Sequence, residues 1–206
     1  MQQWEKDLNT INDVIETWMT VQRKWMYLES IFASDDIKMQ LPEEAKKFGR
    51  TDTAYKKIME SVNHSSNVLH NAVKADGGSR LADLKNISLD LDKCQKSLSN
   101  YLETKQMAFP RFYFISNDDL LQILSVGSDP NAVQDDFEKL FDAINRVSFD
   151  EQDRKMIVEI TQIMGGCNEN IQLVEPVKAE GNIEDWLVKL EKSMQASVRS
   201  ICKKGA

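Results

Sequence analysis

Cysteine is scarce in this sequence, and its placement excludes a domain built on disulfides. The three cysteines, Cys94, Cys167 and Cys202, are far apart and form no C-x-x-C pair. An odd number of scattered cysteines argues against both a disulfide framework and a thiolate metal site. We expect each of them to be a small buried or surface residue in a reducing, intracellular setting.

The sequence also lacks a surplus of positive charge. Lysine and arginine number 26 against 33 aspartates and glutamates, which gives a formal net charge of −7. A nucleic-acid partner needs a basic face, and an anionic membrane attracts the same kind of surface, so we expect neither. No apolar run approaches the roughly 20 residues that span a bilayer. The opening MQQWEKDLNT lacks the basic and then apolar layout of a secretory signal.

Motifs for catalysis and for ligand binding are missing as well. The sequence contains no G-x-x-x-x-G-K-[ST] phosphate loop and no G-x-S-x-G elbow. His64 and His70 have no cysteine or acidic partner at metal-ligand spacing. Acidic pairs fall at predicted turns or helix surfaces, where capping and solubility explain them. We therefore expect no catalytic residue, no cofactor and no metal site; an enzyme built from dispersed acids is the weakest alternative.

The sequence does contain strong helical periodicity, first in residues 3–33. A large apolar residue recurs every seven positions there, and valines and leucines widen the stripe. This pattern predicts one long amphipathic helix that packs in a bundle. Its aromatic residues form a candidate packing stripe: Trp4, Trp18, Trp25 and Phe32. Residues 80–105 repeat the helical period without glycine or proline and predict a second long rod.

Between these rods the sequence predicts shorter helices. Leu41-Pro42 opens a helix with proline near its first position, and Gly49–Asp52 predicts a break in it. Asn63–Ser66 interrupts the pattern before a short helix at 68–73. Asp76–Ser79 is the clearest loop in the chain.

Residues 98–124 join the second rod to the C-terminal half and hold the densest aromatic cluster. Pro110 ends the rod, because it has no backbone N–H and it disfavours a helical conformation in the preceding residue. The run 111–115 is short and aromatic, which predicts an extended, largely buried segment. Ser116, with Asp119 three residues later, predicts the start of the next helix.

This junction has two interpretations. It is either an ordinary core at a corner between helices or a docking site for another part of a larger assembly. The candidate residues are Phe109, Pro110, Arg111, Phe112, Tyr113, Phe114, Leu120 and Leu121. Arg111, which stands between aromatic residues, is expected to pair with a carboxylate or to stack on a ring rather than to bind a ligand.

The pattern changes again in the C-terminal third. A helix beginning at Pro130 is predicted, with an inner face of Val133, Phe137, Leu140, Phe141 and Ile144. Alternating segments on both sides of Gly165–Asn170 predict a β-hairpin, whose apolar face must rest on helices. Gly181-Asn182 then opens a final helix, and the residues after it suggest a piece of a longer protein.

Together these elements predict a mainly α fold. We expect an elongated helical bundle with long amphipathic helices and one small β-hairpin near residues 156–177. Residues 1–206 would form part of one domain with two subdomains: a helical bundle at 1–108, and helices plus the hairpin at 109–206.

Several blocks of this sequence resemble the linker region of dynein heavy chains. They are WxxVQxxWxYLExIF at 18–32, DI at 36–37, QLPE at 40–43, Phe48, CQKSL at 94–98, YLExK at 101–105, FPRFYFISNDDLLxIL at 109–124 and GNIEDWL at 181–187. The tryptophan-rich opening, with QLPEE and FPRFYF, is more similar to axonemal than to cytoplasmic heavy chains. Two places depart from the family's pattern: Lys105-Gln106, where relatives commonly carry a basic pair, and Gly165–Asn170, where they carry a more acidic turn.

The resemblance implies a fragment of the helical lever that lies across a ring of AAA+ modules in a minus-end-directed microtubule motor. ATP would bind and be hydrolysed in that ring, outside this chain, and the AAA+ modules of the same heavy chain would be its partners. Contact with microtubules and other dynein subunits would run through the parent protein, in the cytoskeleton of a ciliary or flagellar axoneme. The residues alone leave one alternative, a non-catalytic helical adaptor that binds partner proteins through its tryptophan-rich stripe.

Overall fold

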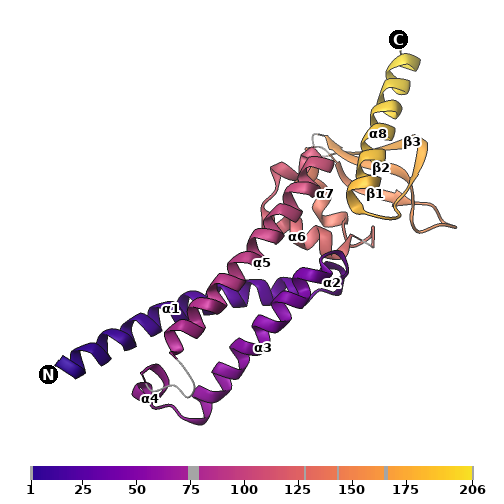
Figure 1. Ribbon diagram of the computed structural model, residues 1–206. Helices are drawn as coiled ribbons and strands as arrows, with labels where there is room; N and C mark the ends of the chain where they lie inside the picture. Colours follow the sequence, from indigo (N-terminus) through magenta and orange to yellow (C-terminus); the bar gives the residue numbers. More distant parts are fainter. Residues whose placement is uncertain (1, 74–78, 128, 143, 165–166, 206) are drawn as a thin grey trace. The chain divides into compact units, whose positions relative to one another are not determined.

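The computed structural model describes residues 2–73, 79–127, 129–142, 144–164 and 167–205, which are mainly helical with one small sheet (Figure 1). This confirms the predicted fold class. The chain divides into two compact units, residues 1–100 and 101–206. Helix α5 (Arg80–Ala108) contributes to both units, because the boundary falls within it.

The first unit consists entirely of helices. Its elements are α1 (Gln2–Phe32), α2 (Asp35–Gln40), α3 (Pro42–His64), α4 (Val68–Ala72) and residues 80–100 of α5. These bounds confirm both predicted rods and the helix opening at Leu41-Pro42; the interruption predicted at Asn63–Ser66 begins at Ser65, because α3 ends at His64. The predicted loop at Asp76–Ser79 lies outside the described residues except for Ser79.

The predicted break at Gly49–Asp52 is wrong, because α3 continues through it. Phe48, Thr51 and Tyr55 lie at helical spacing and are all buried, so one packed face spans the proposed break. A lone glycine costs a helix only about 1 kcal/mol relative to alanine. Burial of that face outweighs this cost.

The core of the first unit is a narrow seam of aliphatic residues. Helix α1 buries Val14, Val21 and Leu28 at seven-residue intervals, and Phe32 one turn later. Helix α5 faces the same core with residues that recur every three or four positions: Leu84, Ile87, Leu91, Cys94 and Leu98. The seam therefore follows the valine and leucine positions of the sequence pattern more closely than the tryptophans.

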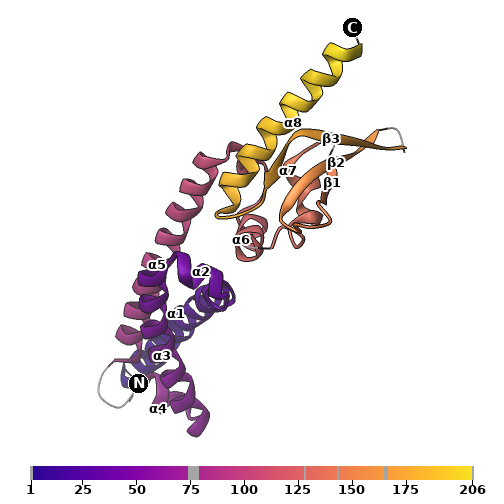
Figure 2. The ribbon, with the colours of Figure 1, turned by 90° about the vertical axis from the view of Figure 1, so that its right-hand side faces the viewer.

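The second unit combines helices with a three-stranded antiparallel sheet of order β1-β2-β3 (Figure 2). Its elements after α5 are η1 (Pro110–Phe114), α6 (Asn117–Val126), η2 (Gln134–Asp136), α7 (Phe137–Leu140), β1 (Ile144–Phe149), β2 (Met156–Met164), β3 (Cys167–Lys178) and α8 (Ile183–Gly205). Strands β2 and β3 confirm the predicted hairpin. The turn residues Gly165 and Gly166 lie outside the described residues.

The predicted helix from Pro130 is wrong in its extent. The chain makes turns and the short 3₁₀ helix η2 before α7, which ends at Leu140, and Ile144 begins strand β1. Strand β1 was missed because its pairing with β2 is a tertiary contact. Val147, at the middle of β1, pairs with Ile160 and is buried.

Side chains form hydrogen bonds with backbone groups of both outer strands of the sheet, β1 and β3. Gln134 bonds both backbone groups of Val147: its Nε2 donates to the carbonyl at 2.8 Å and its Oε1 accepts from the N–H at 3.0 Å. On β3, the Ser197 hydroxyl accepts from Val174 N–H at 2.8 Å, and Ser193 donates to the Glu175 carbonyl at 2.5 Å. These bonds satisfy groups that an edge strand otherwise leaves open to another chain.

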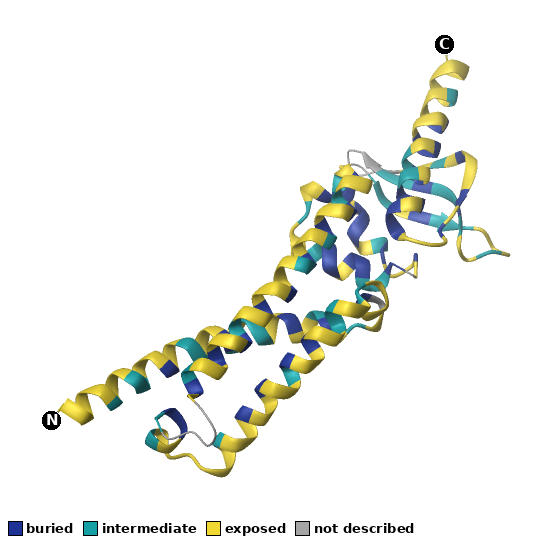
Figure 3. Cartoon of the chain, viewed as in Figure 1, coloured by how far each residue is buried: buried dark blue, intermediate teal, exposed yellow. Residues whose placement is uncertain are grey.

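The final helix starts where the sequence predicted. Gly181 has φ of +86°, a left-handed conformation that favours glycine, and the Asn182 carbonyl accepts from Asp185 N–H at 3.1 Å. Figure 3 shows buried positions recurring along one face of each long helix. Among the described residues, no helix combines the length and apolar character needed to cross a membrane.

Candidate docking junction

The aromatic run after α5 forms a 3₁₀ helix rather than an extended strand. Pro110 occupies the first position of η1, where a missing N–H costs nothing. Phe112 N–H donates to the Phe109 carbonyl at 3.0 Å. A 3₁₀ helix repeats every three residues, so Phe109 and Phe112 share one side of it.

This period divides the aromatic residues between the core and the surface. Phe109 and Phe112 are fully buried, whereas Tyr113 is 57% exposed and Phe114 81% exposed. The prediction of an extended, largely buried segment is therefore wrong for Tyr113 and Phe114. An extended segment would bury alternate residues, and would have turned Phe114 to the same side as Phe112.

The other candidate residues divide in the same way. Pro110 is exposed and Arg111 is half-buried. Leu120 and Leu121, on α6, are buried in the core. The exposed aromatic residues of the junction are thus Tyr113 and Phe114, which we call the aromatic face.

The buried residues of the junction join an aromatic cluster that forms the core of the second unit. Phe109 meets Phe112 edge to face at 5.0 Å between ring centroids and lies 6.3 Å from Phe141. Phe137 links Phe141 to the fully buried Trp186, with centroid distances of 6.2 and 6.4 Å. Contacts of this kind stabilise a core beyond the area they bury. They hold the base of the aromatic face in place.

Arg111 makes both of the contacts expected for it. Its guanidinium donates to Glu191 Oε1 on α8 at 3.2 Å and to the Leu140 carbonyl at 3.3 Å. It also stacks over the Phe141 ring, 4.8 Å from the centroid. Arg111 therefore braces η1 against α7 and α8.

A buried ion pair, which sequence analysis did not find, lies beside the junction. Lys105 in the last turn of α5 contacts Glu184 in the first turn of α8, with Nζ 2.5 Å from Oε1. Lys105 and Glu184 are 8% and 7% exposed, respectively. A signal was present, because Lys105 continues the apolar spacing of Leu98 and Leu102. A lysine on a buried stripe needs a partner.

The surroundings of this pair are apolar and aromatic. Lys105 Nζ lies over the Tyr101 ring at 5.3 Å. Burial and the nearby Glu184 carboxylate raise the pKa of the Tyr101 hydroxyl. Glu184 Oε2 is buried and has no hydrogen-bond partner within the described part of the chain. The buried charge of Glu184 therefore depends on Lys105 for its compensation.

The predicted helix start after the junction is confirmed. Ser116 Oγ accepts from Asp119 N–H at 3.1 Å and donates to Asp119 Oδ2 at 2.6 Å. Lys139 contacts Asp119 at 2.8 Å and Asp136 at 2.9 Å. The hydrogen bonds from Lys139 and then from Ser116 hold the pKa of the Asp119 carboxyl below its usual value. This network ties α6 to α7.

The candidate packing stripe on α1 is also divided between core and surface. Phe32 is buried and stacks on Phe48 at 5.1 Å. Trp25 and Trp18 are half-buried, and their indole N–H groups donate to α3: Trp25 to Asp52 at 2.9 Å and Trp18 to Tyr55 at 3.2 Å. Trp4 is 63% exposed, so its predicted packing is wrong for this unit. The side-chain contacts of this stripe with α3 are made by Trp18, Trp25 and Phe32.

Chemistry of other kinds finds little support in the geometry. Across the described ranges, no group of three His, Cys, Asp or Glu side chains is arranged to hold a metal ion. Cys94 is buried, which raises the pKa of its thiol, and Cys202 is exposed. The side chain of Cys167 lies outside the described part of the structure.

The chain is similar to known proteins over nearly its whole length. Residues 1–205 match the family model described as dynein heavy chain, N-terminal region 2. The chain is 45% identical over 202 residues to human dynein axonemal heavy chain 10, and 43% identical over 202 residues to human dynein axonemal heavy chain 1. It is 46% identical over 203 residues to the dynein-1-alpha heavy chain of the flagellar inner arm I1 complex of Chlamydomonas reinhardtii. These alignments cover 97–98% of this chain and 4% of each relative.

Proposed function

This chain belongs to the dynein heavy chain family, within its N-terminal region, and from that membership we propose that it is part of the linker, the lever of the motor. The lever bends and straightens with the nucleotide state of the AAA+ ring and passes the displacement to the tail. The parent protein would thereby drive minus-end-directed movement along microtubules in a ciliary or flagellar axoneme. The match over residues 1–205 carries this proposal.

The internal construction of each unit suits a mechanical element. Helices α1 and α5 have 31 and 29 residues, and a continuous helix is stiff because every turn repeats its hydrogen bonds. Polar ties fasten α1 to its neighbours at intervals, as between Lys24 and Asp92 at 2.6 Å. The two units would be subdomains of one linker domain. ATP binding and hydrolysis would belong to the ring, outside these 206 residues.

The aromatic face gives the lever a place to dock. Phe114 is 81% exposed although phenylalanine is among the residues most often buried. Its backbone is anchored by the buried Phe109 and Phe112, so the exposed ring is presented from a fixed base. Large aromatic side chains on a rigid base are typical of interface hot spots. We assign the partner as an AAA+ module of the same heavy chain.

The proposal is tested in the intact heavy chain. The double variant Tyr113→Ser and Phe114→Ser should slow microtubule gliding several-fold while ATP turnover without microtubules persists, because the lever would lose a docking position but the ring would keep its sites. The matched control is Met39→Ser, which removes a 72% exposed apolar side chain from α2. Gliding at the control's speed in the double variant would refute docking through the aromatic face.

A second measurement tests the absence of catalysis in the chain itself. The purified 206-residue protein is expected to show no saturable binding of ATP in calorimetry. Binding at micromolar nucleotide would contradict the assignment of nucleotide chemistry to the ring. The adaptor alternative is weakened at Trp18 and Trp25, because both donate their indole N–H groups within the first unit, and it would rest on Trp4, which is 63% exposed.

A further inference from the structure

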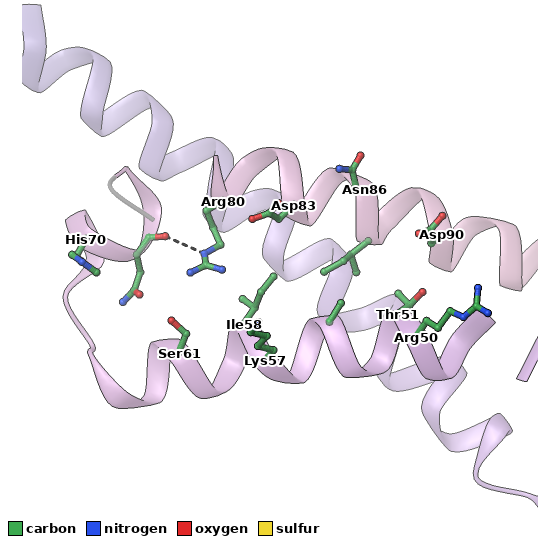
Figure 4. Close-up of a pocket in the computed structure, with 13 residues that line it drawn as sticks. Arg50, Thr51, Lys57, Ile58, Ser61, His70, Arg80, Asp83, Asn86 and Asp90 are labelled. Atoms are coloured by element: carbon green, nitrogen blue, oxygen red, sulfur yellow. Dashed lines mark hydrogen bonds between the residues drawn. The ribbon is translucent and has the colours of Figure 1, made fainter. Parts of the chain in front are cut away.

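A cavity of about 680 Å³ lies in the first unit between α3, α4 and the beginning of α5 (Figure 4). Its size falls in the range of small-molecule sites. Arg80, the first residue of α5, lines it and is 92% buried, since only 8% of its surface is exposed. An arginine is almost never this buried without a charged partner.

One nitrogen of the Arg80 guanidinium is hydrogen-bonded within the protein, and the two terminal nitrogens face the cavity. Its Nε donates to the Asn71 carbonyl at 3.2 Å, which is its one hydrogen bond among the described residues. No ion pair of Arg80 is found within the described ranges either. Figure 4 shows the terminal nitrogens directed across the cavity toward α3. Those nitrogens can donate in parallel to two oxygens of one ligand.

Asn71, whose carbonyl accepts the Arg80 hydrogen bond, is itself held in place by hydrogen bonds. The Asn71 side chain donates to the carbonyls of Ser65 and Asn67, the latter at 3.0 Å, and Asn67 Oδ1 accepts from His70 N–H at 3.0 Å. These bonds lock α4 and the segment before it around the backbone group that holds Arg80 Nε. Arg80 is therefore positioned before any ligand arrives, which reduces the entropy cost of binding.

The position of Arg80 is unfavourable for stability alone. A buried cation loses its hydration, and a cation at a helix N-terminus faces the positive end of the helix dipole. Both costs would be offset by an anion beside the guanidinium. Without such an anion, both costs would remain in the folded state.

The charges around the cavity indicate which anion fits. Three cations line it, Arg50, Lys57 and Arg80, and two acids, Asp83 and Asp90. Asp90 pairs with Lys93 at 2.8 Å. The two acids favour a carboxylate, because they repel its single charge less than that of a phosphate, which carries about −1.5 to −2 at pH 7. A carboxylate also has the two oxygens that a guanidinium fork pairs with.

We propose that this cavity is a carboxylate-binding site with Arg80 as its receptor. The ligand is a monoanionic carboxylate, supplied by a small organic acid or by an acidic side chain of a protein segment that enters the cavity. The site is independent of the linker assignment, and it lies in a different unit from the aromatic face.

The first test follows the side chain directly. Sodium acetate is added to the 206-residue protein at constant ionic strength, and the Nε–H resonances of the arginines are recorded. The Arg80 resonance should shift and saturate, whereas that of Arg50, an exposed arginine of the same cavity, should move little. An Arg80 resonance that does not move, or that moves in parallel with Arg50, overturns the proposal.

The second test uses Arg80→Met, which keeps an unbranched apolar stem but removes the guanidinium and its charge. In chloride buffer this variant should melt at or above the wild-type temperature, because a buried cation without a partner is removed. Acetate should raise Tm in the wild type and in Arg50→Met, but not in Arg80→Met. A large fall in Tm or a failure to fold in Arg80→Met would show that Arg80 serves to hold Asn71. An undiminished acetate response there would show that acetate binds elsewhere. Either result overturns the proposal.

The source of the carboxylate is separated by a comparison of probes. Acetate and a blocked tripeptide with a single glutamate are titrated against the same Arg80 resonance. Tighter binding of the tripeptide assigns the site to a protein segment, and tighter binding of acetate assigns it to a small free acid. Each result supports a carboxylate site. Equal, saturable binding of chloride would refute it.

Discussion

The first unit buries a seam of mainly aliphatic side chains between long helices, whereas the second buries a connected cluster of aromatic rings beside a small sheet. In the first, Val14, Val21 and Leu28 recur along a single helix. In the second, Phe112 and Trp186 come from segments far apart in sequence and belong to one chain of rings through Phe109, Phe141 and Phe137. Local periodicity therefore determines which residues form the first core, whereas tertiary contacts determine which residues form the second.

Among the described residues, the second unit alone contains an enclosed ion pair. In the first, Trp18, Trp25 and Lys24 reach neighbouring helices from half-buried positions at the edge of the seam. In the second, the Lys105–Glu184 pair is enclosed. Exposed or half-exposed ties are screened by water, whereas an enclosed pair is costly to break. We therefore expect substitutions in the second unit to have the larger effects.

The largest effect is expected at Phe112. Phe112→Ala should lower the free energy of unfolding by about 3–5 kcal/mol, because it removes a fully buried ring from the aromatic cluster. Phe114→Ala, two residues away and 81% exposed, should change it by no more than about 0.5 kcal/mol. Urea denaturation followed by circular dichroism measures both. Equal losses in the two variants would erase the distinction between the cluster and the aromatic face.

A comparable effect is expected when the enclosed ion pair is broken. Lys105→Ala should cost about 3–5 kcal/mol, because the Glu184 carboxylate would stay buried without its cation. Adding Glu184→Leu to Lys105→Met should recover most of that loss, because no uncompensated charge remains. The same denaturation measurement tests this. A double variant as unstable as Lys105→Ala would mean that the pair is not the source of the effect.

In the first unit, the seam should matter more than the tryptophan stripe. Leu28→Ala should cost about 2–5 kcal/mol, since Leu28 is 1% exposed and its removal leaves a cavity. Trp4→Ala should be close to neutral, although tryptophan is the larger side chain, because Trp4 is 63% exposed. Thermal unfolding of the two variants compares them. A larger loss for Trp4→Ala would restore the stripe as the core.

The smallest effect concerns the acid behaviour of the α6 cap. The pKa of Asp119 is lower in the folded chain than in the unfolded one, so its contribution is complete above about pH 4 and is lost as the pH falls through the folded value. Asp119→Asn should therefore reduce the fall in Tm between pH 5 and pH 2. Parallel melting curves of wild type and variant over that range would contradict this.

Sequence analysis succeeded where the relevant contacts are local. Helices α1, α5 and α8, the opening at Pro42 and the Ser116 cap were all predicted, because each depends on residues within a turn or two. It failed at Gly49, where packing of α3 overrides a local helix breaker. It also failed at 111–115, because aromatic content favours a strand and does not reveal the three-residue period of η1.

For the junction, the sequence indicated what kind of contact a residue would make but not which distant residue it would contact. The contact of Arg111 with a carboxylate and a ring follows from its chemistry, but Glu191 lies 80 residues away. Lys105 is separated from Glu184 by 79 residues, and no local pattern names such a partner.

The sequence by itself determined the long helices α1, α5 and α8, the Ser116 cap, the hairpin and the family, because these depend on spacing and residue type along the chain. Tertiary structure alone decided that β1 joins the sheet, that Lys105 pairs with Glu184, and that Tyr113 and Phe114 face outward while Phe112 is buried. The physical reason is that burial and pairing depend on which distant surfaces meet, and one segment's periodicity contains no record of its partner.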